Sequence, residues 1–342
     1  MQYATLGRTG LIVSRLAFGA MTFHQGSGMA GVGKVGETEA DALVGRALDA
    51  GINFFDTADA YAAGESETLL GRALKSRRHS AIVATKVGFR AGPAIGQAGL
   101  SRRHILWSVD QSLKRLGTDW IDVYIAHKED PFTPLDETLD AFDAIQRAGK
   151  VRYLGFSNWS AWTAAAALEI QRARGLAAFT HGQMHYSLLG RDVERDVVPM
   201  MTRYGLGLTV WSPLASGFLT GKYTRDTLHD GNNRYASFDI LPFDKEAGFR
   251  LVARMDAIAG GLGITVAQLA VAWLLSKTAV SSVLLGASRI GQFEETLKAA
   301  DVRLGADVVA ALDELTAPAP VYPNWFADGL VDADQKTALA GN

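Results

Sequence analysis

Residues 81 to 156 decide the fold, because they contain three apolar runs of strand length separated by helical patterns. The runs read AIVATK at Ala81–Lys86, IDVYIA at Ile121–Ala126 and VRYLGF at Val151–Phe156. Between them, apolar residues recur at helical spacing after Ser101 and again after Pro134. Strands that alternate with helices in this way predict βαβ units around a parallel sheet.

The same alternation continues outward in both directions. A helical pattern over Glu37–Ala50 ends before Gly51, a suitable C-cap, and Pro134 is expected at the first position of a helix that Gly149 closes. Eight candidate strands, each with a helical pattern nearby, predict an α/β fold that is a single (β/α)8 TIM barrel. These strands are Leu16–Gly19, Asn53–Thr57, Ala81–Lys86, Ile121–Ala126, Val151–Phe156, Phe179–Gln183, Leu206–Trp211 and Ser282–Gly286.

Several segments depart from this rhythm. Within residues 1–15, Tyr3–Val13 predicts a short β-hairpin that turns near Gly7–Gly10 and plugs the bottom of the barrel. His24–Gly36 is glycine-rich, Thr220–Pro242 is long and polar, and residues 317–342 form a proline-containing tail. Both loops follow strands, so they are expected at the C-terminal face, where barrel active sites form. Because no repeat or linker divides the chain, we expect residues 1–342 to form one domain.

Composition excludes several kinds of site and partner. Cysteine is absent from the 342 residues, which rules out disulfides, zinc–thiolate sites and cysteine nucleophiles. A formal net charge of −2 gives no electrostatic reason to expect nucleic acid as a partner. Neither a signal-peptide apolar region nor a run of membrane-spanning length is found. We therefore expect a cytoplasmic protein with no nucleic-acid or membrane partner, and its oligomeric state is left open.

Three patterns match known motifs but lie in an unsuitable context. Gly26–Gly31 matches G-x-G-x-x-G, yet it lies away from both the preceding strand and the following helix, which a dinucleotide-binding turn must join. Gly28–Lys34 nearly matches a P-loop, but Val35 cannot offer a hydroxyl group to magnesium. Tyr124 and Lys128 form a Y-x-x-x-K pair on a strand, where the two lie far apart. We interpret Tyr124 as a packed strand residue.

Four ionisable residues lie at or just after the ends of consecutive candidate strands: Asp56, Tyr61, Lys86 and His127. Carbonyl reduction needs a proton donor, and a phenol with a pKa of about 10 is a poor one unless that pKa is lowered. A lysine held by a carboxylate can lower it, and a histidine can polarise the carbonyl group. Each residue alone has a structural alternative, but a barrel brings strand ends to one mouth. The set therefore predicts a catalytic site.

These motifs resemble those of the aldo-keto reductases, over about Tyr3 to Leu315. NFFDTADAY at 53–61 is similar to the family's aspartate-to-tyrosine motif, and TK at 85–86 and HKEDP at 127–131 follow in the expected order. GKVRYLGFSN at 149–158 is similar to the family's central motif. The resemblance implies that Tyr61 is the general acid in reduction and the base in oxidation. It also implies that Lys86 and Asp56 tune Tyr61, and that His127 orients the substrate carbonyl.

The resemblance also implies a site for NADP(H), with NAD(H) as the alternative. Ser157, Asn158 and Gln183 would bind the nicotinamide carboxamide, since their side chains suit an amide partner. Trp211 would stack on the nicotinamide ring. WSPLASGFLTGK at 211–222 resembles the family's loop over the pyrophosphate, and GASRIGQFEE at 286–295 resembles the segment that binds the adenosine phosphate, for which Arg289 is a bidentate partner. The remaining cofactor-binding candidates are Ser212, Leu214, Gly217, Lys222, Arg234, Gly286, Ser288, Gln292 and Glu295.

The expected function is reversible, NADPH-dependent reduction of an aldehyde or ketone to an alcohol, without a metal. The substrate itself is not readable, and the candidate substrate contacts are Phe23, Phe89, Trp159 and Tyr186. The alternative is a cofactor-binding, redox-sensing regulatory subunit with little turnover, because potassium-channel β subunits also resemble this family. A P-loop phosphotransferase, the third hypothesis, is disfavoured by Val35.

Overall fold

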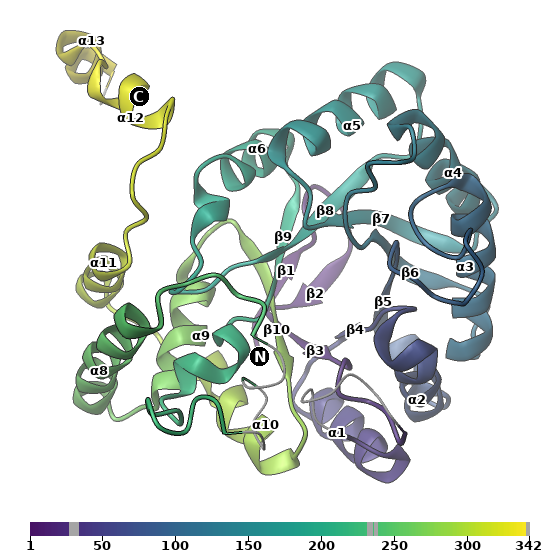
Figure 1. Ribbon diagram of the computed structural model, residues 1–342, viewed down its shortest axis with the longest axis horizontal. Helices are drawn as coiled ribbons and strands as arrows, with labels where there is room; N and C mark the ends of the chain where they lie inside the picture. The colour runs from purple at the N-terminus through teal and green to yellow at the C-terminus, as the bar shows by residue number, and fades with distance from the viewer. Residues whose placement is uncertain (27–33, 231–234, 236–238, 340–342) are drawn as a thin grey trace.

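The computed structural model describes residues 1–26, 34–230, 235 and 239–339, and its centre is a closed barrel of parallel strands (Figure 1). The strands follow one another around the barrel in chain order, and the last pairs with the first. All eight predicted strands are present, with ends within two residues of the prediction, so the (β/α)8 TIM barrel is confirmed. Their bounds are β3 (Leu16–Gly19), β4 (Phe54–Asp56), β5 (Ile82–Val87), β6 (Ile121–Ala126), β7 (Val151–Ser157), β8 (Phe179–His185), β9 (Gly207–Trp211) and β10 (Val280–Gly286).

Helices cover the outside of the barrel, and polar side chains fix where several of them begin. The Ser101 side chain caps α3 by accepting a hydrogen bond from the His104 backbone N–H, and Thr265 forms a capping box with Gln268 on α9. Pro134, which we expected inside the first turn of α4, is instead its N-cap, because its ψ of 136° is still extended. The helices are α1 (Glu37–Asp49), α2 (Glu65–Leu74), α3 (Arg102–Leu116), α4 (Leu135–Arg147), α5 (Ala161–Arg174), α6 (Val197–Tyr204), α8 (Lys245–Leu262), α9 (Val266–Ser276), α10 (Ile290–Leu297) and α11 (Ala306–Leu315), with 3-10 turns η1 (Tyr61–Gly64), η2 (Arg78–Ser80), η3 (Asp192–Glu194), η4 (Ala215–Thr220) and η5 (Lys298–Asp301).

Within the described part of the chain, no single helix is both long and apolar enough to span a membrane. Helices α8 and α9 pass that test only as a pair, and the pair is bent by 88°.

The predicted N-terminal hairpin closes the lower end of the barrel. Strand β1 (Tyr3–Thr5) pairs antiparallel with β2 (Ile12–Ser14). Leu6 and Val13 are fully buried in the core cluster that fills the barrel interior. Gly7 has a φ of 64°, and a Cβ atom there would lie 2.4 Å from a backbone carbonyl oxygen of β8. Only glycine fits so close to the barrel wall at this turn, and the hairpin therefore seats tightly.

Strand residues alternate between two hydrophobic cores. On β6, Val123 and Ile125 face the barrel interior, whereas the fully buried Tyr124 packs on the outer side beneath the helices. The same alternation on β5 places Ala84 in the interior and, two residues later, Lys86 on the same side. The alternation of side chains along a strand therefore points Lys86 toward the interior at the upper end of the barrel. It places Tyr124 among the packed residues beneath the helices, as the sequence predicted.

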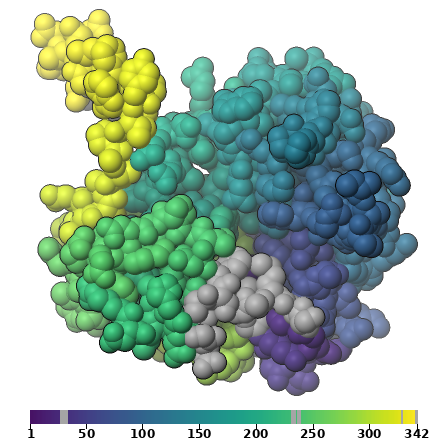
Figure 2. Space-filling model, in the orientation of Figure 1, coloured from purple at the N-terminus to yellow at the C-terminus, as the bar shows by residue number. Residues whose placement is uncertain are grey.

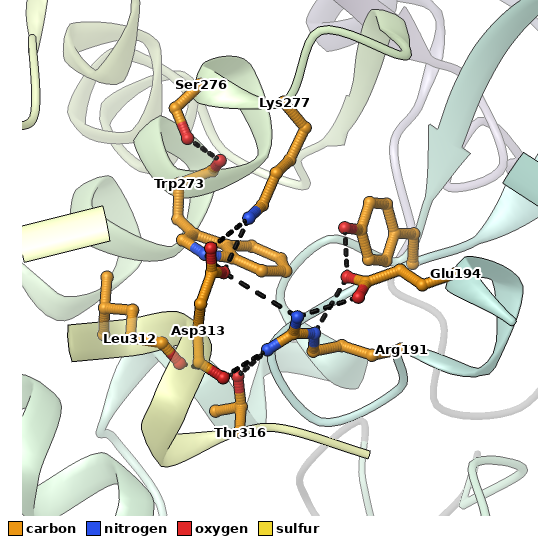
Figure 3. Close-up of polar contacts among 9 residues, drawn as sticks. Arg191, Glu194, Trp273, Ser276, Lys277, Leu312, Asp313 and Thr316 are labelled. Atoms are coloured by element: carbon orange, nitrogen blue, oxygen red, sulfur yellow. Dashed lines mark hydrogen bonds and ion pairs between the residues drawn. The ribbon is translucent and has the colours of Figure 1, made fainter. Parts of the chain in front are cut away.

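Helix α11 is fastened to the chain after β8 by a polar cluster around Asp313 (Figure 3). The Asp313 carboxylate accepts hydrogen bonds from Trp273 Nε1 at 2.8 Å and from Lys277 Nζ at 2.6 Å. Arg191 donates to the Asp313 carbonyl oxygen at 2.7 Å and also contacts Glu194 through Nε at 2.8 Å and Nη2 at 2.7 Å. The cluster therefore joins η3, α9 and α11.

Beyond α11 the predicted tail extends away from the barrel as an arm (Figures 1 and 2). The arm contains α12 (Asn324–Gly329) and α13 (Ala333–Leu339). Tyr322, Trp325 and Phe326 contact one another, yet 73%, 52% and 51% of their surfaces stay exposed. No described residue of the arm lines the cleft at the C-terminal face of the barrel.

We expect Gly155→Ala to lower the free energy of unfolding by about 2 kcal/mol, the usual effect of overpacking a core. The reason is that a Cβ atom at Gly155 on β7 would lie 2.1 Å from Cε1 of the buried His181 ring on β8. Gly10→Ala is the matched control, because its Cβ atom would meet nothing within 4 Å. Urea denaturation measures both changes, and equal effects would contradict the proposed tight contact between β7 and β8.

Candidate active site

The four ionisable residues singled out from the sequence come together at the barrel mouth. Asp56 ends β4, Lys86 lies near the end of β5, and His127 directly follows β6; these three strands are neighbours in the barrel. Tyr61 opens η1, the turn after β4. Asp56, Tyr61 and His127 line one cleft, and Lys86 is fully buried beside them.

Lys86 is the centre of the hydrogen bonding at the cleft floor. Its Nζ atom donates to Asp56 Oδ1 at 2.5 Å, to the Thr57 carbonyl oxygen at 2.8 Å and to the Tyr61 hydroxyl oxygen at 3.3 Å. The ammonium group also lies 4.8 Å from the centre of the Tyr61 ring. Three acceptors therefore surround a cation that has no access to water.

Burial and the Lys86 charge change the pKa of the Tyr61 phenol in opposite directions. Burial raises the pKa of the Tyr61 phenol above its ordinary value, and the nearby Lys86 charge offsets only part of that rise. Although burial opposes the charge of Lys86, the neighbouring Asp56 and Tyr61 raise its pKa, so Lys86 stays a cation. The lysine acts in the direction that the sequence predicted. In this environment, however, the net pKa of the phenol lies above its ordinary value.

His127 is held as a neutral imidazole. Burial, with the adjacent charges of Lys86 and Lys128, lowers the pKa of His127 well below its ordinary value. The ring meets Tyr61 edge-on at 5.7 Å and Phe89 edge-on at 4.6 Å between ring centres. A neutral imidazole in this position can donate a hydrogen bond to a substrate oxygen without adding charge.

The backbone turn after Tyr61 is conformationally unusual. Ala62, Ala63 and Gly64 have φ values of 48°, 53° and 91°, all in the left-handed region. For the two alanines this conformation costs about 1 kcal/mol each. Backbone strain of this kind collects at functional sites, where surrounding contacts hold it in place. Here it lets the chain reverse sharply directly after Tyr61.

A hydrogen-bonded wall connects the four ionisable residues Asp56, Tyr61, Lys86 and His127 to the strands that follow β6. Gln183 Nε2 donates to Asp56 Oδ2 at 2.8 Å, and Ser157 Oγ donates to the Gln183 carbonyl oxygen at 2.7 Å. Asn158 Nδ2 lies 3.0 Å from both Ser157 Oγ and the His127 carbonyl oxygen. Gln183 and Asn158 are therefore hydrogen-bonded directly to Asp56 and His127, and Ser157 joins this network through the Gln183 carbonyl oxygen.

Trp211 completes this wall from the end of β9. Its indole Nε1 donates to Asn158 Oδ1 at 3.0 Å, and the partly exposed ring lines the cleft. The His185 ring backs it, with 5.0 Å between ring centres. Asn158 and His185 thus hold the Trp211 ring in place at the cleft wall. Sequence patterns gave no sign of His185, which only the end of β8 brings under Trp211.

The cleft has a volume of about 660 Å³ and collects most of the predicted cofactor residues. Besides the wall, it includes Ser212, Leu214, Gly217, Lys222, Gly286 and Gln292. Thr296 also lines it. Three predicted cofactor residues are absent from the described cleft lining: Arg289, which is exposed at the N-cap of α10, the half-buried Ser288 and the exposed Glu295. Arg234 lies outside the described residues.

Of the four predicted substrate contacts, the structure places Phe89 on the cleft wall. Phe23, Trp159 and Tyr186 are buried in the core and are absent from the cleft lining among the described residues. Phe23 packs on Phe18, and Trp159 packs between aromatic rings of β7 and β8. The described lining that our sequence analysis missed includes Met21, Thr22, Arg90 and Ile240. Positions just after β3 and β5 could have indicated the first three of these.

The glycine-rich patterns lie between the first barrel strand and the first helix. β3 ends at Gly19 and α1 begins at Glu37, so neither Gly26–Gly31 nor Gly28–Lys34 directly joins a strand end to a helix start. Residues 27–33 of these patterns lie outside the described residues.

Comparison with known proteins adds independent information. The sequence profile of the aldo/keto reductase family matches residues 15–317. The chain is similar to a probable voltage-gated potassium channel subunit beta from Oryza sativa subsp. japonica, with 39% identity over 311 residues that cover 88% of this chain and 92% of the relative. A probable subunit beta from Arabidopsis thaliana is 38% identical over 318 residues, with the same coverage. Versiconal hemiacetal acetate reductase from Aspergillus parasiticus is 31% identical over 344 residues, covering 94% of this chain and 99% of the relative.

We expect Lys86→Met to lower the free energy of unfolding by about 3 kcal/mol, because it leaves the buried Asp56 carboxylate without its cation. Adding Asp56→Asn in the same chain should recover part of that loss, since the unpaired charge is then gone. Arg174→Ala is the control, because it breaks a solvent-exposed ion pair with Asp140 and should cost under about 1 kcal/mol. Chemical denaturation of the four proteins decides the point; a double variant less stable than Lys86→Met would contradict it.

Proposed function

Because this chain belongs to the aldo/keto reductase family, we propose that it catalyses the reversible, NADPH-dependent reduction of an aldehyde or ketone to an alcohol. Family membership itself supports an oxidoreductase. The observation that carries the finer proposal is the hydrogen-bonded series from Asp56 through Lys86 to the Tyr61 hydroxyl at the cleft floor. The Tyr61 hydroxyl group and the neutral His127 ring line one cleft, and the buried Lys86 cation contacts the hydroxyl group from behind.

In reduction, Tyr61 gives its hydroxyl proton to the substrate oxygen as the carbonyl carbon accepts hydride. The Lys86 ammonium group, 3.3 Å from the Tyr61 oxygen, stabilises the phenolate that remains. Burial raises the pKa of Tyr61, so the proton stays in place until negative charge develops on the substrate oxygen. In the reverse direction, the phenolate accepts the alcohol proton.

His127 orients the substrate. Its low pKa, caused first by burial, keeps the ring uncharged at neutral pH. The neutral ring donates a hydrogen bond to the carbonyl oxygen and leaves Tyr61 as the proton donor. The edge-on contact of His127 with Tyr61, at 5.7 Å between ring centres, keeps both groups on the same side of the cleft.

The wall residues suit a nicotinamide dinucleotide. Ser157, Asn158 and Gln183 offer both donors and acceptors to a carboxamide, and the Trp211 ring offers a flat face. Such a cofactor supplies the hydride when bound. Lys222 lines the cleft, and Arg289 is free to meet a phosphate at the start of α10; both favour an anionic, phosphorylated ligand.

Tyr61→Phe should reduce the rate of NADPH oxidation with a panel of aldehydes and ketones by about 10²- to 10⁴-fold, because the proton donor is lost. Binding of NADPH, followed by its fluorescence, should be unchanged. Tyr124→Phe is the matched control, since Tyr124 is fully buried on the outer side of β6, away from the cleft. Comparable loss in both variants would contradict the role of Tyr61.

Arg289→Ala should weaken NADPH binding by about tenfold or more and change NADH binding far less, because one charge-assisted contact to the additional phosphate is removed. Arg172→Ala, an exposed arginine on α5, is the control. Fluorescence titration with both nucleotides measures the effect. Equal weakening of NADPH and NADH would remove Arg289 from the phosphate site.

The identity of 38–39% to proteins named as potassium channel β subunits favours a second candidate, a cofactor-binding regulatory subunit with little turnover. Tight NADPH binding without oxidation across a wide carbonyl panel would support this second function. Turnover that depends on Tyr61 would support the reductase. If neither NADPH nor NADH binds, both proposals fail.

A further inference from the structure

A second buried polar layer lies behind the cleft, between the outer side of the barrel and the helices α2 and α3. It is separate from the Asp56–Lys86 pair, which faces the barrel interior. All but one of its side chains are fully or almost fully buried. Its members are Asp59, Glu67, Thr85, Ser108, Arg115 and Tyr124.

This layer contains two carboxyl groups but one guanidinium group, and the two carboxyl groups differ in the hydrogen-bond donors that surround them. Glu67 accepts hydrogen bonds from Arg115 Nε and from Thr85 Oγ1, both at 2.6 Å. Asp59 accepts a hydrogen bond from Ser108 Oγ to Oδ2 at 2.7 Å, and the Ala60 backbone N–H also interacts with its carboxyl group. Its other oxygen, Oδ1, is buried and lacks a well-formed hydrogen bond among the described residues. Glu67 is therefore the better paired of the two carboxyl groups.

Asp59 is consequently the group that takes up a proton. Burial raises the pKa of Asp59 from 3.8 to about 7, and the nearby Glu67 charge adds to this rise, while Ser108 and Arg115 oppose it. Burial raises the pKa of Tyr124 on β6, and the Asp59 charge adds to that rise. The charge of a fixed, buried group thus changes within the range in which an enzyme works at neutral pH.

The same residue is tied directly to the proton donor of the cleft. Asp59 precedes Tyr61 by two residues, and its backbone N–H donates to the Lys86 carbonyl oxygen at 3.2 Å. On the cleft side, Lys86 and Asp56 are the charged groups that face Tyr61. A negative charge on Asp59 opposes ionisation of the Tyr61 phenol, in addition to the larger effect of burial. Asp59 therefore acts on Tyr61 both through their shared loop and through its charge.

We propose that Asp59 is a positioning residue for Tyr61: its hydrogen bonds with Ser108 and with the Lys86 carbonyl oxygen fix it in the wall behind the cleft, two residues before Tyr61, where its carboxylate acts as a fixed negative charge on the phenol. The catalytic meaning of this inference rests on the proposed function, because Tyr61 is the proton donor only if the chain is a reductase. The electrostatic coupling itself does not depend on turnover.

The direct test is an NMR titration of protein labelled with ¹³C at tyrosine Cζ, in which Tyr61→Phe identifies the Tyr61 signal. Asp59→Asn should lower the midpoint of Tyr61 ionisation by about 0.5–1 pH unit, as expected for removal of one nearby negative charge in a partly buried setting. An unchanged or higher midpoint would overturn the proposal.

Two control variants separate charge from structure. Ser108→Ala removes the hydrogen bond to Asp59 but keeps the charge, so at the alkaline pH of Tyr61 ionisation its midpoint should match the wild type. Asp143→Asn removes a buried carboxylate on α4, away from the cleft, and should also leave the midpoint unchanged. A shift in Asp143→Asn equal to that in Asp59→Asn would mean that the effect is not local, and it would overturn the proposal.

The wild-type protein offers a measurement that needs no variant at Asp59. Ionisation of Asp59 at a pH of about 7 should produce a small step in the Tyr61 Cζ chemical shift between pH 5 and pH 9. A flat signal over that range would contradict the coupling.

Kinetics then connect the coupling to the reaction. If Tyr61 is the proton donor, the alkaline fall of kcat/KM for NADPH-dependent reduction should move to lower pH in Asp59→Asn by the same 0.5–1 unit, roughly as charge removal predicts. A purely structural role would lower the rate without moving the profile. If no carbonyl is reduced while the Tyr61 midpoint still shifts, the proposed function fails and the coupling stands.

Discussion

The buried ion pair between Lys86 and Asp56 is the constraint on which the rest of the barrel mouth depends. Removing two opposite charges from water costs several kcal/mol for each ion, and the cost is offset only if both are closely paired and their remaining hydrogen-bonding capacity is used. Here Thr57 and Tyr61 take the other hydrogen bonds of the ammonium group, and Gln183 donates to the second carboxylate oxygen. These groups come from β4 and the residues that follow it, from β5 and from β8, so the closed barrel brings them together.

That requirement also couples the two sides of the cleft. A continuous series of hydrogen bonds runs from Lys86 and Asp56 through Gln183 and Ser157 to Asn158, and then to Trp211. The group that would handle the proton and the wall that would hold the proposed cofactor therefore share one network. Hydrogen-bond networks of this type are stabilising when every polar group in them has a partner, and the loss of one hydrogen bond weakens the others.

The sequence predicted the barrel well because its strands are short runs of apolar residues whose ends carry ionisable side chains. Asp56, Lys86 and His127 were recognisable because charged or titratable groups seldom end such runs without a reason. The substrate side was less readable. Phe23, Trp159 and Tyr186 have the size and character of ligand contacts, but packing on rings such as Phe18 and Trp273 places them in the core. Asp59 was missed because only the three-dimensional fold shows that Arg115 forms its hydrogen bond with Glu67 and not with Asp59.

The N-terminal hairpin has a consequence for how ligands enter and leave the barrel. The hydrophobic core inside the barrel, in which Leu6 and Val13 of the hairpin are packed, lies below the cleft lined by Asp56, Tyr61 and His127. Among the described residues, Tyr61 and Trp211 line the same cleft, so molecules that contact either of them enter from the same face of the barrel. We expect a molecule bound deeper in this cleft to enter before, and to leave after, a molecule bound nearer its opening.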